Sequence, residues 1–506
     1  MYMIVLNRIL RKQSITMKMK PKIIRLFLLA VLYVQQINVA SAQTYNIKDY
    51  GEVSDTNKVC TAAIQRAIDV CHANGGGRVL VPAGLYKSGT VVLKDHVELH
   101  LASGACLVAS SSVDDFPCMP IAPYRSLKEG KGWFSLIYAQ NAHDISITGR
   151  GVIDGRGHGR KGAVSGVAGD SNGRPRNILF ISCKNVHVDG ITMRNSALWN
   201  QHYLDCEDVT VTDIKVWNHC NGNNDGIDID GCRRFILSNS IIDSDDDGIV
   251  LKSTGLAPCE DVVVKGCIVS SWANAIKLGT ESTGGYKNIL IVDCQVKPSA
   301  NKGKRIIKST VSGISAISLE LVDGGIMDGV TVDNIQIDGT ECPIYVRLGN
   351  RARKHVLEAP EPQIGKMRNI VISNIHAYHV GNFGSSITGI IDGKIENISL
   401  SNIYISNRGG LKKGSYRTMG DNRGKRHDMS GNLFANQYWK SAKEVKEDDK
   451  GYPQPTVWGN LPCYGLFVRH VNHLRMNNVV FTSENEEPRK VVIMQDVRHY
   501  EGQTWK

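Results

Sequence analysis

Beyond its first 42 residues, the 506-residue sequence lacks any apolar run long enough for a membrane-spanning helix. Its 50 glycines and 15 prolines follow no Gly-X-Y period, which excludes a collagen-like chain. No Cys-x-x-Cys pair or His/Cys cluster has zinc spacing, and no Ser–His constellation or phosphate-cradling loop stands out. Charged residues are 22% against 42% hydrophobic residues, so global disorder is excluded as well. We therefore expect a folded globular protein with no metal ion and no cofactor.

Residues 1–42 lack acidic residues altogether but carry seven basic ones, the last of which is Arg25. An apolar stretch and the small residues Ala40-Ser41-Ala42 follow, which is typical of a secretory signal peptide with its cleavage site. Without those seven charges the formal net charge of +11 falls to +4, so a nucleic-acid partner is not expected. We expect residues 1–42 to be a signal peptide and the protein to be exported to a periplasm or the extracellular space, with no membrane span after signal removal.

A short alternation of apolar and polar residues returns along the remaining chain. It is found, for example, at Asp144–Ile147, Asn185–Val188, Asp208–Val211 and Asp261–Val264, and the successive units are 23 to 41 residues apart. Alternation of this kind indicates strands, and a repeat of this length indicates a solenoid of stacked coils. The sequence therefore predicts an all-β fold, a parallel β-helix, formed by one domain over residues 43–506.

Three further features fit stacked coils. Cys183, Cys206, Cys232 and Cys259 each precede the repeat's first apolar residue by three positions, which predicts buried packing residues in register rather than disulfides. Residues 61–73 have helical spacing, and such a helix would cover the open end of a solenoid. Segments 119–135, 156–176 and 410–458 break the repeat, and we expect them to be loops that shape a binding site.

Acidic residues are concentrated in two turns that are one coil apart. Asp225 is followed by Asp246 after 21 residues and by Asp247 after 22, so the three carboxylates should lie side by side. Carboxyl groups that lie so close together repel one another when ionised, so the pKa of at least one of them should be raised. Glycosidic hydrolysis needs such a protonated acid beside an ionised carboxylate. Two other interpretations stay open, because Asp and Asn are ordinary turn residues and clustered carboxylates also suit calcium.

The run Asn223-Asn224-Asp225-Gly226-Ile227-Asp228 resembles the first signature of the polygalacturonase-like glycoside hydrolases of family 28, Asn-Thr-Asp-Gly-x-Asp. Asp246-Asp247 resembles the second signature of that family, and the similarity extends over most of residues 44–498. The resemblance implies a right-handed parallel β-helix that hydrolyses pectic polysaccharides with inversion. It also implies that Asp246 is the general acid and that Asp225 and Asp247 activate water.

The sequence departs from that family in its substrate-binding signatures. Gly-His-Gly is missing, with Asn274 near the position of the histidine, and Arg-Ile-Lys is absent where the register predicts it. Other polar residues are candidates for binding the substrate, as a carboxylate clamp or as hydrogen-bond partners of sugar hydroxyls: Lys252, Asn274, Lys277, Glu281, Arg347 and Arg351. The substrate is consequently left open between polygalacturonan and rhamnogalacturonan.

We expect a monomeric glycoside hydrolase that acts on an acidic polysaccharide or oligosaccharide. Two other functions remain open on the same fold. A polysaccharide lyase would recruit Lys252 or Lys277 as a base and often calcium, whereas a non-catalytic glycan-binding protein would explain the missing signatures.

Overall fold

The computed structural model describes residues 43–51, 58–119, 134–158, 173–302, 313–355, 360–411 and 442–505. Residues from Thr44 onward form one compact unit. The expected signal peptide and most of the three expected loops lie outside the described residues. Within the ranges given above, no helix has both the length and the apolar character needed to cross a membrane.

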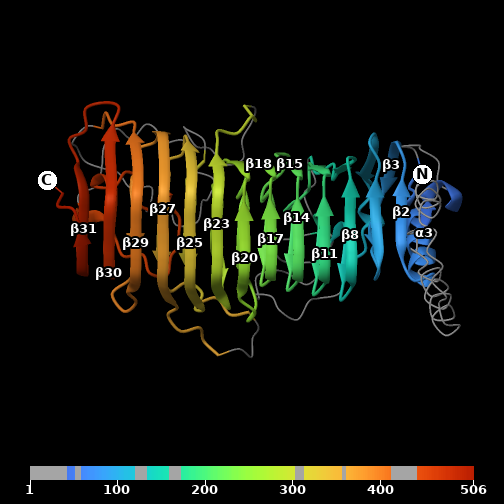
Figure 1. Ribbon diagram of the computed structural model, residues 1–506, viewed down its shortest axis with the longest axis horizontal. Coiled ribbons are helices and arrows are strands. Elements are labelled where there is room, and N and C mark those ends of the chain that lie inside the picture. The colour runs from blue at the N-terminus through green and yellow to red at the C-terminus, as the bar shows by residue number, and fades with distance from the viewer. Residues whose placement is uncertain are drawn as a thin grey trace, which may run out of the picture. The chain divides into compact units, whose positions relative to one another are not determined.

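The described strands form a right-handed parallel β-helix, and each coil contributes strands to three faces (Figure 1). Face A is built from β4 (Val91–Val92), β7 (Ser135–Gln140), β10 (Arg176–Ile181), β13 (Gln201–Leu204), β16 (Ile227–Asp230), β19 (Ile249–Ser253), β22 (Asn274–Ser282), β24 (Ser315–Leu321), β26 (Cys342–Leu348), β28 (Ser385–Thr388), β30 (Cys463–Ser483) and β31 (Lys490–Gly502). These strands pair in parallel in that order.

The other two faces complete each coil. Face B contains β1 (Thr44–Asn46), β2 (Gly77–Val81), β5 (Val97–Leu101), β8 (His143–Gly149), β11 (Lys184–Asp189), β14 (Glu207–Thr212), β17 (Arg233–Ser238) and β20 (Cys259–Lys265). Face C contains β3 (Gly84–Ser88), β6 (Ala105–Ala109), β9 (Val152–Asp154), β12 (Thr192–Arg194), β15 (Lys215–Asn218), β18 (Ile241–Ser244) and β21 (Ile268–Ser271). Later strands run through faces B and C: β23 (Gly285–Val296), β25 (Ile326–Asp338), β27 (Lys366–Val380) and β29 (Ile395–Asn407). The long strands β30 and β31 continue from face A into face B.

The residues of the sequence repeat stack directly on one another inside the coil. Val186 pairs with Val209, which pairs with Phe235 and so on along face B, and all three are buried. Cys183, Cys206, Cys232 and Cys259 are buried in the same register, and all 13 cysteines are free thiols. The predicted fold class and the interior cysteine ladder are both confirmed. The core is thus a set of apolar columns that runs the length of the solenoid.

Residues near the start of the face B strands form a column of their own. Residues in equivalent positions, such as Asp144, Asn185, Asp208 and Asn288, all have positive φ angles of 50–56°. Short Asx side chains tolerate this left-handed conformation because they can hydrogen-bond locally. Asn288, for instance, donates from Nδ2 to Oδ1 of Asp261 on the preceding coil at 3.1 Å. The turn residues therefore lie in register as closely as the core does.

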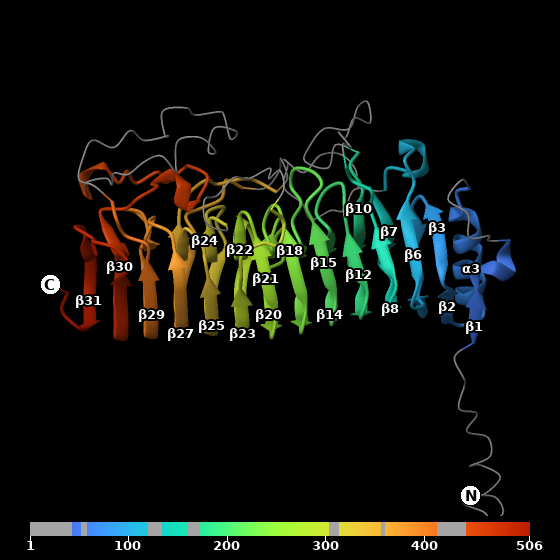
Figure 2. The ribbon, with the colours of Figure 1, turned by 90° about the horizontal axis from the view of Figure 1, so that it is seen from above.

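The expected helix is present as α3 (Thr61–Ala73), and it lies at the N-terminal end of the coils beside β2 (Figures 1 and 2). Its face of Ala63, Ile64, Ala67, Ile68 and Cys71 is buried. The other helices within the described ranges are short 3-10 helices of three or four residues: η1 (Ile47–Tyr50), η2 (Val113–Asp115), η5 (Ala442–Glu444) and η6 (Pro455–Val457). The helix α3 covers apolar core that the first coil would otherwise expose, as the apolar periodicity predicts.

Candidate active site

A column of polar residues stands where the strands of face A begin. The register places Asp225 on Asp247 and Asp247 on Asn274, because Gly226 N–H donates to Asp247 O at 2.9 Å and Gly248 N–H donates to Asn274 O at 2.8 Å. Parallel strands repeat the same turn on every coil, so residues one coil apart become neighbours. The predicted proximity of the two acidic turns is therefore found in the structure.

Asp246 lies beside this column in the same turn as Asp247. Its Oδ1 accepts the Asp247 N–H at 3.0 Å, and its backbone carbonyl accepts the Ser271 hydroxyl at 2.6 Å. Desolvation, reinforced by the charge of Asp247, raises the pKa of Asp246 to about 7, although Lys277 and Lys252 oppose the shift. Near neutral pH this carboxyl group can therefore hold a proton next to other carboxylates.

Asp225 and Asp228 lie on the preceding coil, next to a buried lysine of β19, the strand that follows Asp246 and Asp247. The Lys252 ammonium is 3.4 Å from Asp228 Oδ1 and 3.9 Å from Asp225 Oδ2. Desolvation and the neighbouring carboxylates raise the pKa of Asp225 well above its usual value, and desolvation raises the pKa of Asp228 to about 7. Burial alone would lower the pKa of Lys252, but the surrounding carboxylates outweigh it and raise that pKa. Lys252 is thus a buried, charged ammonium group surrounded by carboxyl groups.

Asp247 is held by groups of the following coil. Its Oδ1 accepts hydrogen bonds from the N–H and Nδ2 of Asn274 at 3.1 and 2.6 Å, and its Oδ2 lies 2.9 Å from the Lys277 ammonium. Lys277 is also 3.3 Å from the Tyr452 hydroxyl and 3.9 Å from Glu320 Oε2. An acidic residue with both oxygens fixed in this way is oriented as a hydrogen-bond acceptor.

Glu281 forms the next part of the site, with three cations around it. Its Oε2 is 3.5 Å from Lys252 Nζ, and its Oε1 is 2.9 Å from Arg353 Nη1 and 3.7 Å from Arg351 Nη2. Burial would raise the pKa of Glu281, but the charges of Lys252, Arg351 and Arg353 outweigh it and lower that pKa. Arg351 also binds both oxygens of Asp323 and donates to Thr280 Oγ1 at 2.9 Å.

Arg347 stands apart from this cluster, further along face A. Its guanidinium donates to the carbonyls of Gly389, Glu447 and Asp448 at 3.0, 2.5 and 3.1 Å. It lies under a segment that we define as the cover segment, residues 442–461. Val445, Trp458 and Leu461 of the cover segment pack on Tyr345 and Phe467, whose side chains point outward from face A.

The structure thus brings together Asp225, Asp246, Asp247, Lys252, Asn274, Lys277, Glu281 and Arg351, and it places Arg347 under the cover segment. It adds Asp228, Glu320, Arg353 and Tyr452 to the candidates. Asp228 could have been found from its place in the first signature and from the outward position of alternate residues in a strand. Tyr452 carries no such signal, because it is 175 residues from Lys277 in the sequence.

The carboxylates of the site already have cationic neighbours. Lys277 contacts Asp247, and Lys252 contacts Asp225, Asp228 and Glu281. A calcium ion at this position would have to compete with two buried ammonium groups. This arrangement favours acid–base chemistry over the calcium interpretation.

Comparison with known proteins agrees with the fold and with the signatures. The sequence model of the family described as glycosyl hydrolases family 28 matches residues 71–418. A probable polygalacturonase of Vitis vinifera is 29% identical over 289 residues, which are 52% of this chain and 57% of that protein. An exo-poly-alpha-D-galacturonosidase of Dickeya chrysanthemi is 26% identical over 254 residues, which are 42% of either chain. The chain thus spans about half the length of each of these relatives.

A solved structure shows the same architecture. The family 28 exopolygalacturonase of Yersinia enterocolitica superposes with a TM-score of 0.65 at 19% sequence identity. That alignment covers 90% of this chain and 78% of the other chain. At 19% sequence identity this structural similarity is evidence for the fold alone.

Proposed function

The chain belongs to the glycosyl hydrolases of family 28, and on that basis we propose that it hydrolyses glycosidic bonds in an acidic pectic polysaccharide of the polygalacturonan type. The observation that carries this proposal is the cluster of Asp225, Asp246 and Asp247 on adjoining turns of face A. The names of its relatives, polygalacturonase and exo-poly-alpha-D-galacturonosidase, support the same class of substrate.

In the proposed mechanism Asp246 donates a proton to the leaving glycosidic oxygen. Its raised pKa, about 7, supports this role because a general acid must be protonated at the working pH. Asp247, whose oxygens are oriented by Asn274 and Lys277, would act with Asp225 as the acceptor that activates a water molecule. Inversion at the anomeric carbon is part of this proposal, and membership of the family supports it.

The cations around Glu281 support an acidic sugar as the substrate. Arg353 is partly exposed and contacts Glu281, and the buried Lys252 contacts both Glu281 and Asp225. Guanidinium and ammonium groups bind a uronate carboxylate through charge-assisted hydrogen bonds. The same groups would bind the galacturonate units of a rhamnogalacturonan, so this substrate is the second candidate to be tested.

The cover segment supports attack at chain ends. Toward the C-terminus it lies over face A, where it buries the outward side chains Tyr345 and Phe467, and its Tyr452 reaches Lys277 beside the acids (Figure 2). A polysaccharide that followed face A would meet this segment shortly after passing the acidic turns. We therefore infer that the acidic turns of face A bind a chain end rather than the middle of a long polymer.

A lyase mechanism is less well supported by the same geometry. A lyase needs an unprotonated base next to the uronate, and nearby carboxylates raise the pKa values of both Lys252 and Lys277. Both lysines would then be charged and would act as hydrogen-bond donors instead.

We also propose that residues 1–42 direct export and are removed, and that residues 43–506 form a single catalytic domain. Sequencing the N-terminus of the protein recovered from the exporting cell's periplasm or medium would test this proposal. A start at Gln43 is expected, and an intact N-terminus would contradict it.

The decisive experiment is a product assay with polygalacturonan and rhamnogalacturonan, in which new reducing ends and the absorbance of unsaturated uronides are recorded together. Asp246→Asn should lose the activity, by about 100-fold or more. Asp261→Asn is the matched control because Asp261 is an exposed residue near the start of β20 on face B. Reducing ends without absorbance would support the hydrolase, whereas absorbance that rises with them would make the protein a lyase. Unchanged activity in Asp246→Asn would refute the assignment of the acid.

A further inference from the structure

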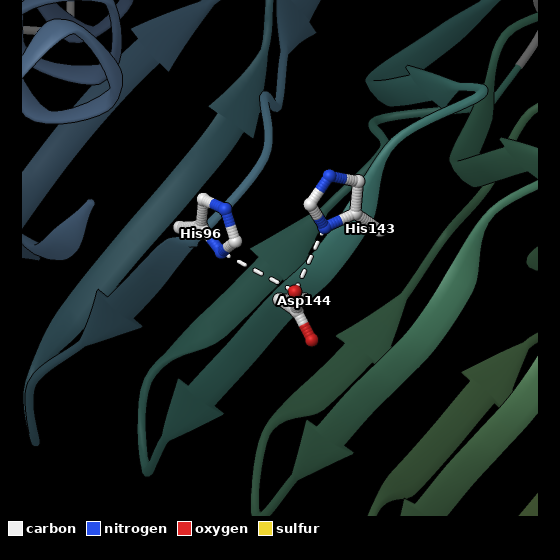
Figure 3. A group of neighbouring side chains, drawn as sticks. All are labelled: His96, His143 and Asp144. Carbon is white, nitrogen blue, oxygen red and sulfur yellow. Dashed lines mark hydrogen bonds and ion pairs between the residues drawn. The ribbon is translucent and has the colours of Figure 1, made fainter. Parts of the chain in front are cut away.

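Two histidines and an aspartate meet on the turns of face B at the N-terminal end of the solenoid (Figure 3). His143 and Asp144 begin β8, and His96 directly precedes β5. Because Glu98 pairs with Ser146, His96 stands in register with Asp144 on the next coil. His96 and Asp144, with φ angles of 62° and 55°, belong to the column of left-handed residues described above, and His143 directly precedes Asp144. All three residues are on a different face from the acidic turns.

The ligand atoms of these side chains point at one another. Asp144 Oδ2 is 2.8 Å from Nδ1 of His143 and 3.3 Å from Nδ1 of His96. The two imidazole rings lie edge to face with their centroids 4.7 Å apart. All three side chains are between 42 and 49% exposed, so further coordination positions are open to water or to another ligand.

The neighbouring residues hold two of the three groups in place. Asn185, on the following coil, donates to Asp144 Oδ1, which leaves Oδ2 facing the histidines. Asp95 Oδ1 accepts a hydrogen bond from the backbone N–H of His143 at 2.8 Å, and Asp95 Oδ2 lies 3.7 Å from the ring nitrogen Nε2 of His143. A carboxylate near the outer nitrogen of a metal-binding histidine is a common supporting arrangement, since it orients the ring and raises its basicity.

We propose that His96, His143 and Asp144 form a site for a divalent late transition metal such as Zn²⁺ or Cu²⁺. Two imidazoles with one carboxylate suit these ions, whereas Ca²⁺ and Mg²⁺ prefer oxygen ligands throughout. The bound ion would link His96, directly before β5, to His143 and Asp144 at the start of β8. It would thereby stabilise the contact between these two coils. It takes no part in the proposed hydrolysis, because the acids lie on face A.

The sequence offers no zinc spacing here, because His96 and His143 are 47 residues apart. Only the stacking of coils brings them together.

The test is a titration of the full chain, without a polyhistidine tag, with Cu²⁺ and with Zn²⁺ in a calorimeter. We expect one ion per chain, with Cu²⁺ bound more tightly than Zn²⁺. His96→Gln/His143→Gln should weaken binding by about 100-fold, and Asn185→Ala by about tenfold. His379→Gln is the matched control, because His379 is an exposed histidine paired with a single carboxylate, Asp338, at 2.7 Å.

Electron paramagnetic resonance of the Cu²⁺ complex gives a second readout. Two coordinating nitrogens are expected for the wild-type chain and one for His96→Gln. No uptake by the wild-type chain would overturn the proposal, as would equal affinity in the double variant or only one nitrogen in the wild-type spectrum. Loss of binding in His379→Gln alone would overturn it as well, because that ion would be bound elsewhere.

Discussion

The Lys277 ammonium lies 2.9 Å from Asp247 Oδ2 on the preceding coil, and both side chains are almost fully buried, with 2% and 7% exposure. Asp247 directly follows Asp246 in the same turn, and its charge adds to desolvation in raising the pKa of Asp246, whereas Lys277 opposes that shift. The two members of this pair therefore act differently: Lys277 orients the proposed base, and Asp247 favours protonation of the proposed acid.

The first prediction concerns the strength of this pair. Lys277→Met and Asp247→Asn should each lower the free energy of unfolding, by about 3 kcal/mol for the lysine, because each leaves a buried partner uncompensated. The double variant should lose less than the sum of the two, which urea unfolding would measure as a double-mutant cycle. The exposed pair Lys287–Glu260, at 2.6 Å, is the control and should couple by less than about 1 kcal/mol. Additive losses at Lys277 and Asp247 would contradict the prediction.

The second prediction is a pH profile. Asp246 has to be protonated to act as the acid, so kcat should fall as the pH rises through about 7. Asp245 helps to raise the pKa of Asp246, and Asp245→Asn should therefore move this fall to lower pH. Initial rates on a pectic substrate between pH 4 and 9 would measure both. A rate that increases above pH 7 would exclude Asp246 as the acid.

The third prediction concerns stability at Asp228, whose pKa is raised by burial to about 7 in the folded chain and is near 4 when unfolded. Between about pH 4 and pH 7, Asp228 is protonated in the folded state but ionised in the unfolded state. Its contribution to the free energy of unfolding therefore falls as the pH rises through this range. Asp228→Asn should consequently be more stable than the wild type at pH 8, by roughly 4 kcal/mol for a pKa raised from near 4 to about 7, and nearly equal to it at pH 4. Thermal unfolding at the two pH values would measure this difference, and Asp261→Asn should show none.

The fourth prediction tests the cover segment. Arg347→Met removes hydrogen bonds to the carbonyls of Gly389, Glu447 and Asp448, so the cover segment should loosen from face A. Products from polygalacturonan should then change from single terminal units to a mixture of longer oligomers, as resolved by chromatography. Arg475→Met is the control, since Arg475 forms an exposed ion pair with Glu501 at 2.9 Å on face B. An unchanged product profile in Arg347→Met would show that the cover segment does not determine the mode of attack.

Much of the fold could be predicted because its determinants are short-range and repeated. The apolar residues Val186, Val209 and Phe235 come at the spacing that stacks them in one column. The same periodicity places Asp225 on Asp247 without knowledge of any other contact. For Arg347 the sequence predicts a substrate-binding residue, whereas the structure places its guanidinium against backbone carbonyls under the cover segment. Strand alternation indicates that this side chain points outward, but it does not indicate which segment covers it.

The sequence by itself determined the coil, its register, the turn columns and the neighbourhood of the three proposed catalytic aspartates, since each depends on residues one coil apart. Only the tertiary structure decided which groups surround those acids. Tyr452 comes to Lys277 across 175 residues, and the cover segment reaches Arg347 across about 100. The same holds for His96 and Asp144, which meet through stacked turns. The physical reason is that a repeat specifies contacts between adjacent coils, whereas the path of a long connection and the burial of charges depend on the whole folded chain.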